Sequence, residues 1–315
     1  MASAPVGKSI IFSLRREAKL VAYQAGQGFT PIEIKPSKRP FTDPNFEPYG
    51  IAFDAAKSEL WVGDKWNSAL WQMELKYTNN RIDLIPKAEF RSELMSQPCA
   101  IDFDSQHGIL VACFGRTCGS HGGVSVLNNG RWSRLWGGGL GQSVAQACWL
   151  PDGGFSFVHY YGSVLCAVPT TTKPPVECSL RDQRTLGRQT GKLPELRLRY
   201  VQGLTYSKSQ KRIIVSDGSL GAIYEVDYLG GAYRLLAGKP TLTDTSFSSE
   251  LKPGPSNQWL GRIRAAFEDA FGHLIWLDGS TSRLFKLDLK NPNVFQLHAN
   301  GFTKRLVGSS GIVAI

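Results

Sequence analysis

The chain has 315 residues, 42% of them hydrophobic and 20% charged, and the excess of lysine and arginine over acidic residues gives a formal net charge of +10. No apolar run is long enough to span a membrane, and residues 1–8 lack the basic and apolar regions of a signal peptide. We therefore expect a protein that is intracellular (cytoplasmic) or virion-associated, without membrane insertion.

A cassette that starts with a small residue recurs six times along the chain. The separations between successive small residues are 50, 47, 56, 62 and 46, for Gly50, Ala100, Ala147, Gly203, Ala265 and Gly311. This period is typical of propeller blades. The sequence predicts an all-β fold, a six-bladed β-propeller that occupies residues 1–315 as a single domain.

Within each cassette, short apolar runs follow one another with turn residues between them. In the first copy, residues 48–54 are followed by 59–64 and 69–75. The fourth copy repeats this order at 212–217 and 222–227. Such β-branched and aromatic runs, separated by Gly, Asn, Asp and Ser, predict successive antiparallel strands. Small residues in the first strand relieve crowding where strands converge.

The sixth cassette, residues 309–315, has one strand only, and the chain begins with two strand-like runs at 9–14 and 19–23. These pieces complete one another. We expect a last blade that is closed jointly by N- and C-terminal strands, which leaves no unpaired sheet edge.

The order of a small residue, an apolar pair, an acidic turn and then Val-x-Asp, as at Val62 to Asp64 and Val215 to Asp217, resembles the NHL-repeat family of six-bladed propellers. Residues 142–168 and the copy after Arg262 depart from that pattern. The resemblance implies a central channel and loops on two faces that are available for binding.

The segment at about 170–200 is basic and lacks a blade pattern. It contains Pro174 and Pro175 and is predicted to be a loop insertion, a kind of segment that is often functional. We predict a contact arm for a partner, with a merely solvated loop as the alternative. The proposed partner-binding residues are Arg181, Arg184, Arg188, Lys192, Arg197 and Arg199. An acidic protein surface or nucleic acid would suit them.

The residues that precede the small positions are expected to surround one mouth of the channel: Tyr49, Cys99, Gln146, Gln202, Arg264 and Ser310. They lack the acidic oxygens that a calcium-like ion requires. With one arginine, such a mouth suits a carboxylate or a peptide terminus.

Alignment of the second-strand ends gives Asp64, Cys113, His159, Asp217 and Asp278. Such residues could activate water at a bound ion, but an aspartate before a turn more often accepts backbone N–H bonds. The six cysteines are predicted to be reduced thiols, and the alternative, a zinc set of Cys99, Cys113, Cys118 and His121, has loose spacing. We predict no catalytic set, no metal and no cofactor.

The leading functional prediction is a non-enzymatic propeller that is a docking or structural component of a larger assembly. It is either a scaffold for protein or RNA or a virion or phage-tail part, and the latter predicts a homo-oligomeric ring. The alternative is a six-bladed propeller hydrolase of the lactonase or strictosidine-synthase-like type with a site at the channel mouth.

Overall fold

The computed structural model describes residues 9–14, 19–24, 28–34, 45–78, 81–115, 122–137, 143–159, 164–170, 176–177, 190–240, 253–258, 260–269, 271–279, 281, 283–299 and 309–314. Residues 1–144 with 307–315 form one compact unit, and residues 145–306 form a second. Within the described ranges, no helix is long and apolar enough to cross a membrane.

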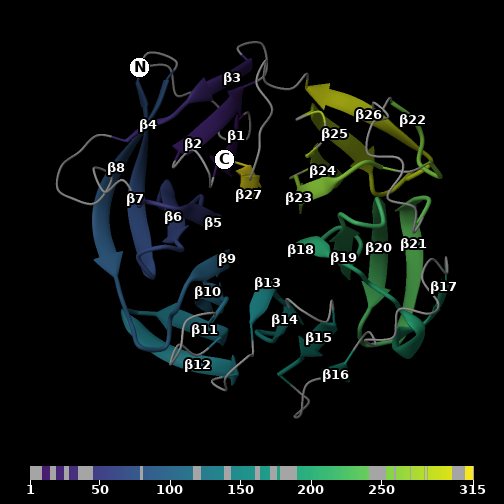
Figure 1. Cartoon of the computed structure of the whole chain (residues 1–315), viewed down its shortest axis with the longest axis horizontal. Coiled ribbons are helices and arrows are strands. Elements are labelled where there is room, and N and C mark those ends of the chain that lie inside the picture. The colour runs from purple at the N-terminus through teal and green to yellow at the C-terminus, as the bar shows by residue number, and fades with distance from the viewer. Residues whose placement is uncertain are drawn as a thin grey trace. The chain divides into compact units, whose positions relative to one another are not determined.

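The first unit contains three sheets, which can be followed in Figure 1. The first has the order β27 (Ser309–Ala314), β1 (Ser9–Leu14), β2 (Lys19–Gln24) and β3 (Gly28–Pro31). The second has the order β4 (Glu33–Ile34), β8 (Arg81–Phe90), β7 (Ala69–Thr78), β6 (Glu59–Asp64) and β5 (Pro48–Asp54). The third has the order β12 (Arg131–Gly137), β11 (Gly123–Asn128), β10 (Gly108–Cys113) and β9 (Pro98–Asp104).

The second unit also contains three sheets. The first has the order β13 (Val144–Trp149), β14 (Phe155–His159), β15 (Leu165–Val168) and β16 (Val176–Glu177). The second has the order β17 (Thr190–Lys192), β21 (Ala232–Gly238), β20 (Ala222–Asp227), β19 (Arg212–Asp217) and β18 (Val201–Ser207), with the 3₁₀ helix η3 (Leu193–Glu195) after β17. The third has the order β22 (Gly254–Pro255), β26 (Val294–Ala299), β25 (Arg283–Asp288), β24 (His273–Asp278) and β23 (Ile263–Glu268).

The two ends of the chain share one sheet, as predicted. Strand β27 pairs antiparallel with β1, with Ile11 opposite Val313 and Phe12 opposite Ile312. The N-terminal strand β1 in turn pairs with β2. A blade made from both termini is therefore confirmed.

Alternate residues of the second strands face two different hydrophobic cores. In β19, Ile213 and Val215 pack in one core, whereas Ile214 between them packs in another. The side chains of a strand alternate between the two faces of its sheet, and both faces are covered here. All three residues are therefore at most 1% exposed. Burial of each such side chain contributes about 1.5 to 3 kcal/mol.

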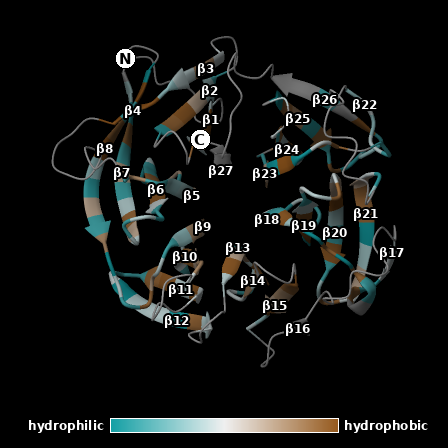
Figure 2. Ribbon diagram, in the orientation of Figure 1, coloured by the Kyte–Doolittle hydropathy of each residue, from teal (hydrophilic) through white to brown (hydrophobic). Residues whose placement is uncertain are grey.

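Burial decreases from the central to the outer strands of a sheet. In the sheet of β9–β12, β10 is almost entirely buried, whereas exposed and half-buried residues alternate along β12. Figure 2 shows the corresponding change from a hydrophobic β10 to a more hydrophilic β12. The outermost strand is thus adapted to solvent.

Four outer strands carry a β-bulge at a corresponding position. In β21, Ile223 pairs with Ala237 but its neighbour Tyr224 pairs with Leu235, so one residue is extra. The extra residues are Lys87 in β8, Leu135 in β12, Leu236 in β21 and His298 in β26. Bulges bend a strand and interrupt its ladder, which limits pairing with further strands.

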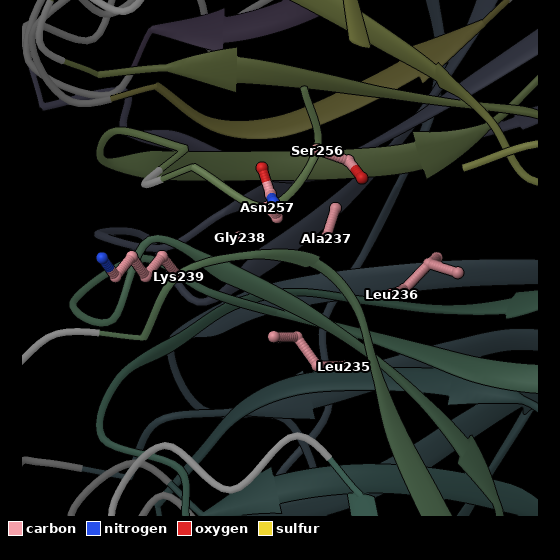
Figure 3. A pocket seen from close by; sticks show the side chains of 7 residues that line it. All are labelled: Leu235, Leu236, Ala237, Gly238, Lys239, Ser256 and Asn257. Carbon is pink, nitrogen blue, oxygen red and sulfur yellow. The ribbon is translucent and has the colours of Figure 1, made fainter. Parts of the chain in front are cut away.

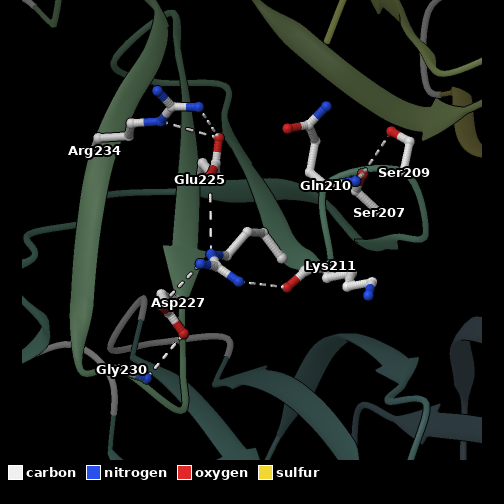
Figure 4. A network of polar contacts seen from close by, with 9 residues as sticks. Ser207, Ser209, Gln210, Lys211, Glu225, Asp227, Gly230 and Arg234 are labelled. Atoms are coloured by element: carbon white, nitrogen blue, oxygen red, sulfur yellow. Dashed lines mark hydrogen bonds and ion pairs between the residues drawn. The ribbon is translucent and has the colours of Figure 1, made fainter. Parts of the chain in front are cut away.

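Ion pairs link three strands in the sheet of β17–β21 (Figure 4). Both Nε and Nη2 of Arg234 donate to Glu225 Oε2, at 3.0 and 2.6 Å. Arg212 Nη2 lies 3.0 Å from Asp227 Oδ2. Because the arginines are 54% and 36% exposed, each pair contributes little to stability.

The small residues of the first strands stand where backbones of neighbouring sheets approach closely. A Cβ atom on Gly50 would lie 2.8 Å from both Ala100 Cα and Ile101 N. In the second unit, a Cβ atom on Gly203 would lie 3.0 Å from the backbone nitrogen of Ala266. This crowding is the physical reason for the glycine that begins each of these two cassettes.

We predict that Gly50→Ala lowers the free energy of unfolding by about 1 to 3 kcal/mol, because the added methyl must displace the β9 backbone. Urea unfolding followed by tryptophan fluorescence measures the change. The matched control is Gly254→Ala, whose added methyl meets only the end of the Gln258 side chain. Equal stability of Gly50→Ala and the wild type would contradict this account of the crowding.

Candidate binding site at the first strands

The predicted mouth residues coincide with β-bulges in the first strands. In β18, Val201 pairs with Asp217 and Gly203 with Ser216, so Gln202 is the extra residue. A register shift also occurs in β5, where it includes Tyr49 and Gly50. In three other first strands, one residue is extra: Cys99, Arg264 and Ser310. Gln146 lies half-buried in β13. A bulge redirects a side chain away from the regular alternation of a strand. That these residues line a channel stays a prediction.

Four residues that follow a second strand occupy equivalent positions. Each donates its backbone N–H to a carbonyl just before the first strand of the same sheet, at 2.7 to 3.2 Å: Lys65 to Glu47, Phe114 to Gln97, Gly218 to Tyr200 and Gly279 to Arg262. In three of these sheets, the residue at this position contacts the bulged residue of the first strand. The identity of this residue therefore determines the chemistry around the bulge.

In the first unit, this arrangement encloses a cation between aromatic rings. Lys65 is only 8% exposed, and its Nζ atom lies 4.8 Å from the ring centroid of Tyr49 and 4.5 Å from that of Phe114. Each ring attracts the ammonium through its negative face. The neighbouring Cys99 thiol donates to Val144 O at 2.8 Å, and burial raises the pKa of Cys99 far above its usual value.

In the second unit, glycines leave room for two polar side chains. A Cβ atom on Gly279 would lie 2.5 Å from Arg264 Cγ and 2.7 Å from Arg264 Nε, so the arginine stem lies against the glycine backbone. Gly218 similarly faces Gln202 Cγ and the carbonyl of Ile263. Both polar side chains are half-buried. Strands β18 and β23 thus bring an amide and a guanidinium, both donors to carboxylates, to adjacent bulges.

The aspartates that end the second strands accept N–H bonds from two backbone segments, one before the first strand and one after the second strand. The carboxylates of Asp64, Asp217 and Asp278 are fully buried. Asp217 accepts from the backbones of Arg199, Tyr200, Ser219 and Leu220 at 2.6 to 3.3 Å. Asp64 accepts from the backbones of Glu47 and Asn67, and Asp278 from those of Arg262 and Thr281. The structure supports the turn-forming interpretation of these residues.

Burial and hydrogen bonding act in opposite directions on Asp217. Loss of water raises the pKa of this carboxyl above its ordinary value, and the four backbone donors counteract the rise only in part. An anion surrounded by fixed N–H dipoles is oriented for structure.

Cys113 takes the aspartate position in the sheet of β9–β12. Burial raises the pKa of this thiol to about 11, and Cys99, Cys148 and Cys166 are likewise buried. Cys118 and His121, the other members of the predicted zinc set, and the side chain of His159 lie outside the described residues. Among the residues described, no group of three or more His, Cys, Asp and Glu side chains is placed to hold a metal ion.

The described end of the predicted basic insertion packs onto a sheet. Strand β17 pairs with β21, and Leu193, Leu196 and Leu198 are buried in the adjoining core. Lys192 and Arg199 are exposed, whereas Arg197 is half-buried. Arg181, Arg184 and Arg188 lie outside the described residues. A partner-binding role for Lys192, Arg197 and Arg199 stays a prediction.

Sequence reasoning missed Lys65. A signal was present, because the residue after the second-strand aspartate is glycine in two copies and lysine in the first. A buried lysine where two other copies have glycine marks a local departure from the repeat.

Comparison with known proteins defines the fold. No protein-family model and no curated protein sequence matches the chain. Among solved structures, a chain in the nidogen/laminin complex superposes with a TM-score of 0.64, 12% identity and coverage of 98% of this chain and 99% of that chain. A streptogramin B lyase superposes with a TM-score of 0.61 and 10% identity, over 98% of this chain and 88% of that chain. The virginiamycin B lyase from Staphylococcus aureus superposes with a TM-score of 0.60 and 9% identity, over 98% of this chain and 86% of that chain.

These likenesses, together with the six sheets, confirm the prediction of a six-bladed β-propeller fold, and the resemblance to NHL-type propellers holds at the level of the fold. At this identity, the likeness does not carry an activity from one protein to another.

We predict that Asp217→Asn lowers the free energy of unfolding by about 3 kcal/mol or more, because the amide nitrogen cannot accept bonds and faces buried N–H donors. Chemical denaturation monitored by circular dichroism tests this. Asp288→Asn is the control, since that exposed carboxylate accepts one N–H bond, from Lys290. If Asp217→Asn lowered the free energy of unfolding no more than Asp288→Asn does, the hydrogen bonds of Asp217 would not stabilise the two loops as described.

We also expect Cys99, Cys113, Cys148 and Cys166 to resist a thiol reagent in the native protein at about pH 8, since all four are buried and burial blocks access. Mass spectrometry of peptides labelled before and after unfolding in guanidinium chloride measures this. Rapid native labelling of Cys113 would show that its strand end is open.

Proposed function

We propose that the protein is a non-enzymatic propeller that acts as a docking or structural component of a larger assembly. The observation that carries this proposal is the use of the second-strand carboxylates. Asp64, Asp217 and Asp278 are the acidic residues that a catalytic site at the strand ends would use, and their oxygens accept backbone N–H bonds from the surrounding loops. Their geometry favours a rigid scaffold over acid, base or metal chemistry.

The bulged residues supply the recognition chemistry in this proposal. Arg264 and Gln202 in the second unit suit a carboxylate, such as an acidic side chain or a peptide terminus of a partner. Because the Arg264 stem rests on Gly279, part of its conformational freedom is already lost before binding. The aromatic pair around Lys65 in the first unit fixes a positive charge in the same way.

A protein partner is the version that the comparisons favour. The neighbour from the nidogen/laminin complex was crystallised with a protein partner, which supports a protein-binding role for a propeller of this size. A virion or phage-tail part is a second version of the same role and requires several copies of the chain in a ring. An intracellular location fits either version.

Mass measurement of the purified protein tests the assembly proposal. We expect light scattering during size exclusion to give a defined multimer, or a monomer that forms a defined complex with its partner, without stoichiometric metal in the same peak. A monomer that carries one divalent ion per chain would contradict the proposal and favour the propeller hydrolase. In that case, Asp217→Asn should be assayed for activity against lactone and ester substrates.

Nucleic-acid binding is a second candidate, because Lys192 and Arg199 are exposed at the end of the basic segment. A fluorescein-labelled single-stranded RNA would then bind with an affinity that falls steeply as salt rises, since bound cations are released from the phosphates. The double variant Lys192→Glu, Arg199→Glu should weaken binding at every RNA sequence. The control is Lys19→Glu, an exposed lysine of β2. Affinity that does not depend on salt would remove this candidate.

A further inference from the structure

Three outer strands carry a short added strand at the same place relative to their β-bulge. Strand β4 pairs with residues 83–84 of β8, β17 with 232–234 of β21, and β22 with 294–295 of β26. The bulge follows four residues after the start of each paired length, at Lys87, Leu236 and His298. The length of an outer strand just before its bulge is therefore where this fold accepts an extended segment.

The sheet of β17–β21 shows how the bulge limits such a segment. The described ladder between β17 and β21 ends at Arg234, two residues before the bulged Leu236. Past that point, residues 235–239 line a pocket of about 420 Å³ together with Ser256 and Asn257 (Figure 3). A bulge bends its strand and interrupts the ladder, so we expect an added strand to be confined to the residues before it.

Strand β12 has the same bulge, but among the described residues it has no added strand. Its bulge is at Leu135, so the corresponding length begins at Arg131. In the other three sheets, the added strand belongs to the connection that enters the sheet. Here that connection, residues 91–97, is described throughout and contains no strand. It is bound to β11 instead, because Ser125 Oγ donates to Leu94 O at 2.7 Å.

The chain on either side of this length is also described. In this sheet, the stretches outside the description are 116–121 and 138–142, which adjoin the paired ends of β10, β11 and β12. Arg131 lies at the other end of β12, directly after the turn of Asn129 and Gly130. The description is therefore continuous from β11 through the turn to the bulge.

The turn between β11 and β12 fixes which backbone groups of β12 point outward. Asn128 pairs with Arg131 across it, and its two residues, Asn129 and Gly130, have φ of 49° and 76°. In such a turn, the N–H of the fourth residue bonds to the carbonyl of the first. Hydrogen-bonded and non-hydrogen-bonded pairs then alternate along an antiparallel ladder. The N–H and C=O of Trp132 therefore point away from β11, toward the outer edge of the sheet.

The side chains of this length combine positive charge with an aromatic ring. Arg131 and Ser133 lie exposed on one face of β12. Trp132 and Arg134 lie half-buried on the other face, where Trp132 packs against a hydrophobic core. The chain has no aspartate or glutamate from residue 105 to residue 151, so the strand meets an acidic segment without like charges of its own. Tryptophan and arginine are the residue types that most often dominate binding energy.

We propose that residues 131–134 of β12 bind an extended acidic segment of a protein partner as an added antiparallel strand. An apolar side chain of that segment lies opposite Trp132, and carboxylates lie opposite Arg131 and Arg134. Backbone bonds to Trp132 hold the segment, and the side chains select it. The inference rests on the proposed docking function and deepens it by naming the contact and the chemistry of the bound segment.

The probe is a fluorescein-labelled peptide of about eight residues with the central order glutamate, threonine, valine and glutamate, which places the valine opposite Trp132. Fluorescence anisotropy with the full-length protein should show saturable binding. N-methylation of the valine removes the N–H that bonds to Trp132 O and should weaken binding at least about tenfold. The matched control is N-methylation of the threonine, whose nitrogen points away from β12, and it should change binding by less than about twofold.

Charge is tested on both sides of the contact. Arg131→Glu should weaken binding about fivefold, whereas Arg81→Glu, which changes an exposed arginine at the start of β8, should leave it unchanged. A peptide with lysines in place of both glutamates should bind at least about fivefold more weakly. Circular dichroism establishes that each variant is folded. Absence of saturation at about 0.5 mM protein, or equal losses from the two N-methylated peptides, would overturn the proposal.

Hydrogen exchange tests whether the edge is open before the probe is added. With mass spectrometry that resolves single amides, the N–H of Trp132 should exchange at least about tenfold faster than that of Ser133, and the probe should slow it. Protection of Trp132 without probe at about 1 µM protein would show that another segment of this chain covers the edge. Protection only at about 100 µM would show that a second copy covers it, and either result would overturn the proposal. The mass measurement above uses no peptide, so a defined assembly with no probe binding would remove this inference and leave the docking function standing.

Discussion

In three of the six sheets, a fully buried aspartate at the end of the second strand accepts backbone N–H bonds from the loops on both of its sides. In these three blades, the tie joins the loop after the second strand to the segment before the first strand. It fixes the segment that enters the first strand, and a second bond, from the residue after the aspartate to a carbonyl in that segment, closes the connection. A buried N–H without a partner is costly, so the loops have few alternatives.

The tie lies beside the bulges of the first strands, and each bulge sets the direction of one side chain. Where glycine follows the aspartate, as at Gly218 and Gly279, the bulged Gln202 and Arg264 lie over its backbone. Where lysine follows it, the ammonium of Lys65 lies between the rings of Tyr49 and Phe114. A repeated scaffold thus acquires different chemistry in each blade through a single variable position. The side chains at these bulges are cationic, aromatic or neutral polar.

The outer strands must limit their exposed edges. Their bulges at Lys87, Leu135, Leu236 and His298 interrupt the ladder, and short added strands cover part of the edge in three sheets. Exposed edges invite pairing with other chains, so a fold with six such edges must limit them.

The sequence by itself determined the blade period, the small residue in each first strand and the sharing of one blade by both termini. These features repeat, and a repeat reveals local constraints without knowledge of the neighbours. Only the tertiary structure decided that the second-strand carboxylates bind backbone, that Lys65 is enclosed by two rings and that residues 193–198 pack into a core. Those facts depend on contacts between segments far apart in the chain, where burial and hydrogen bonding are set by the packing of whole sheets.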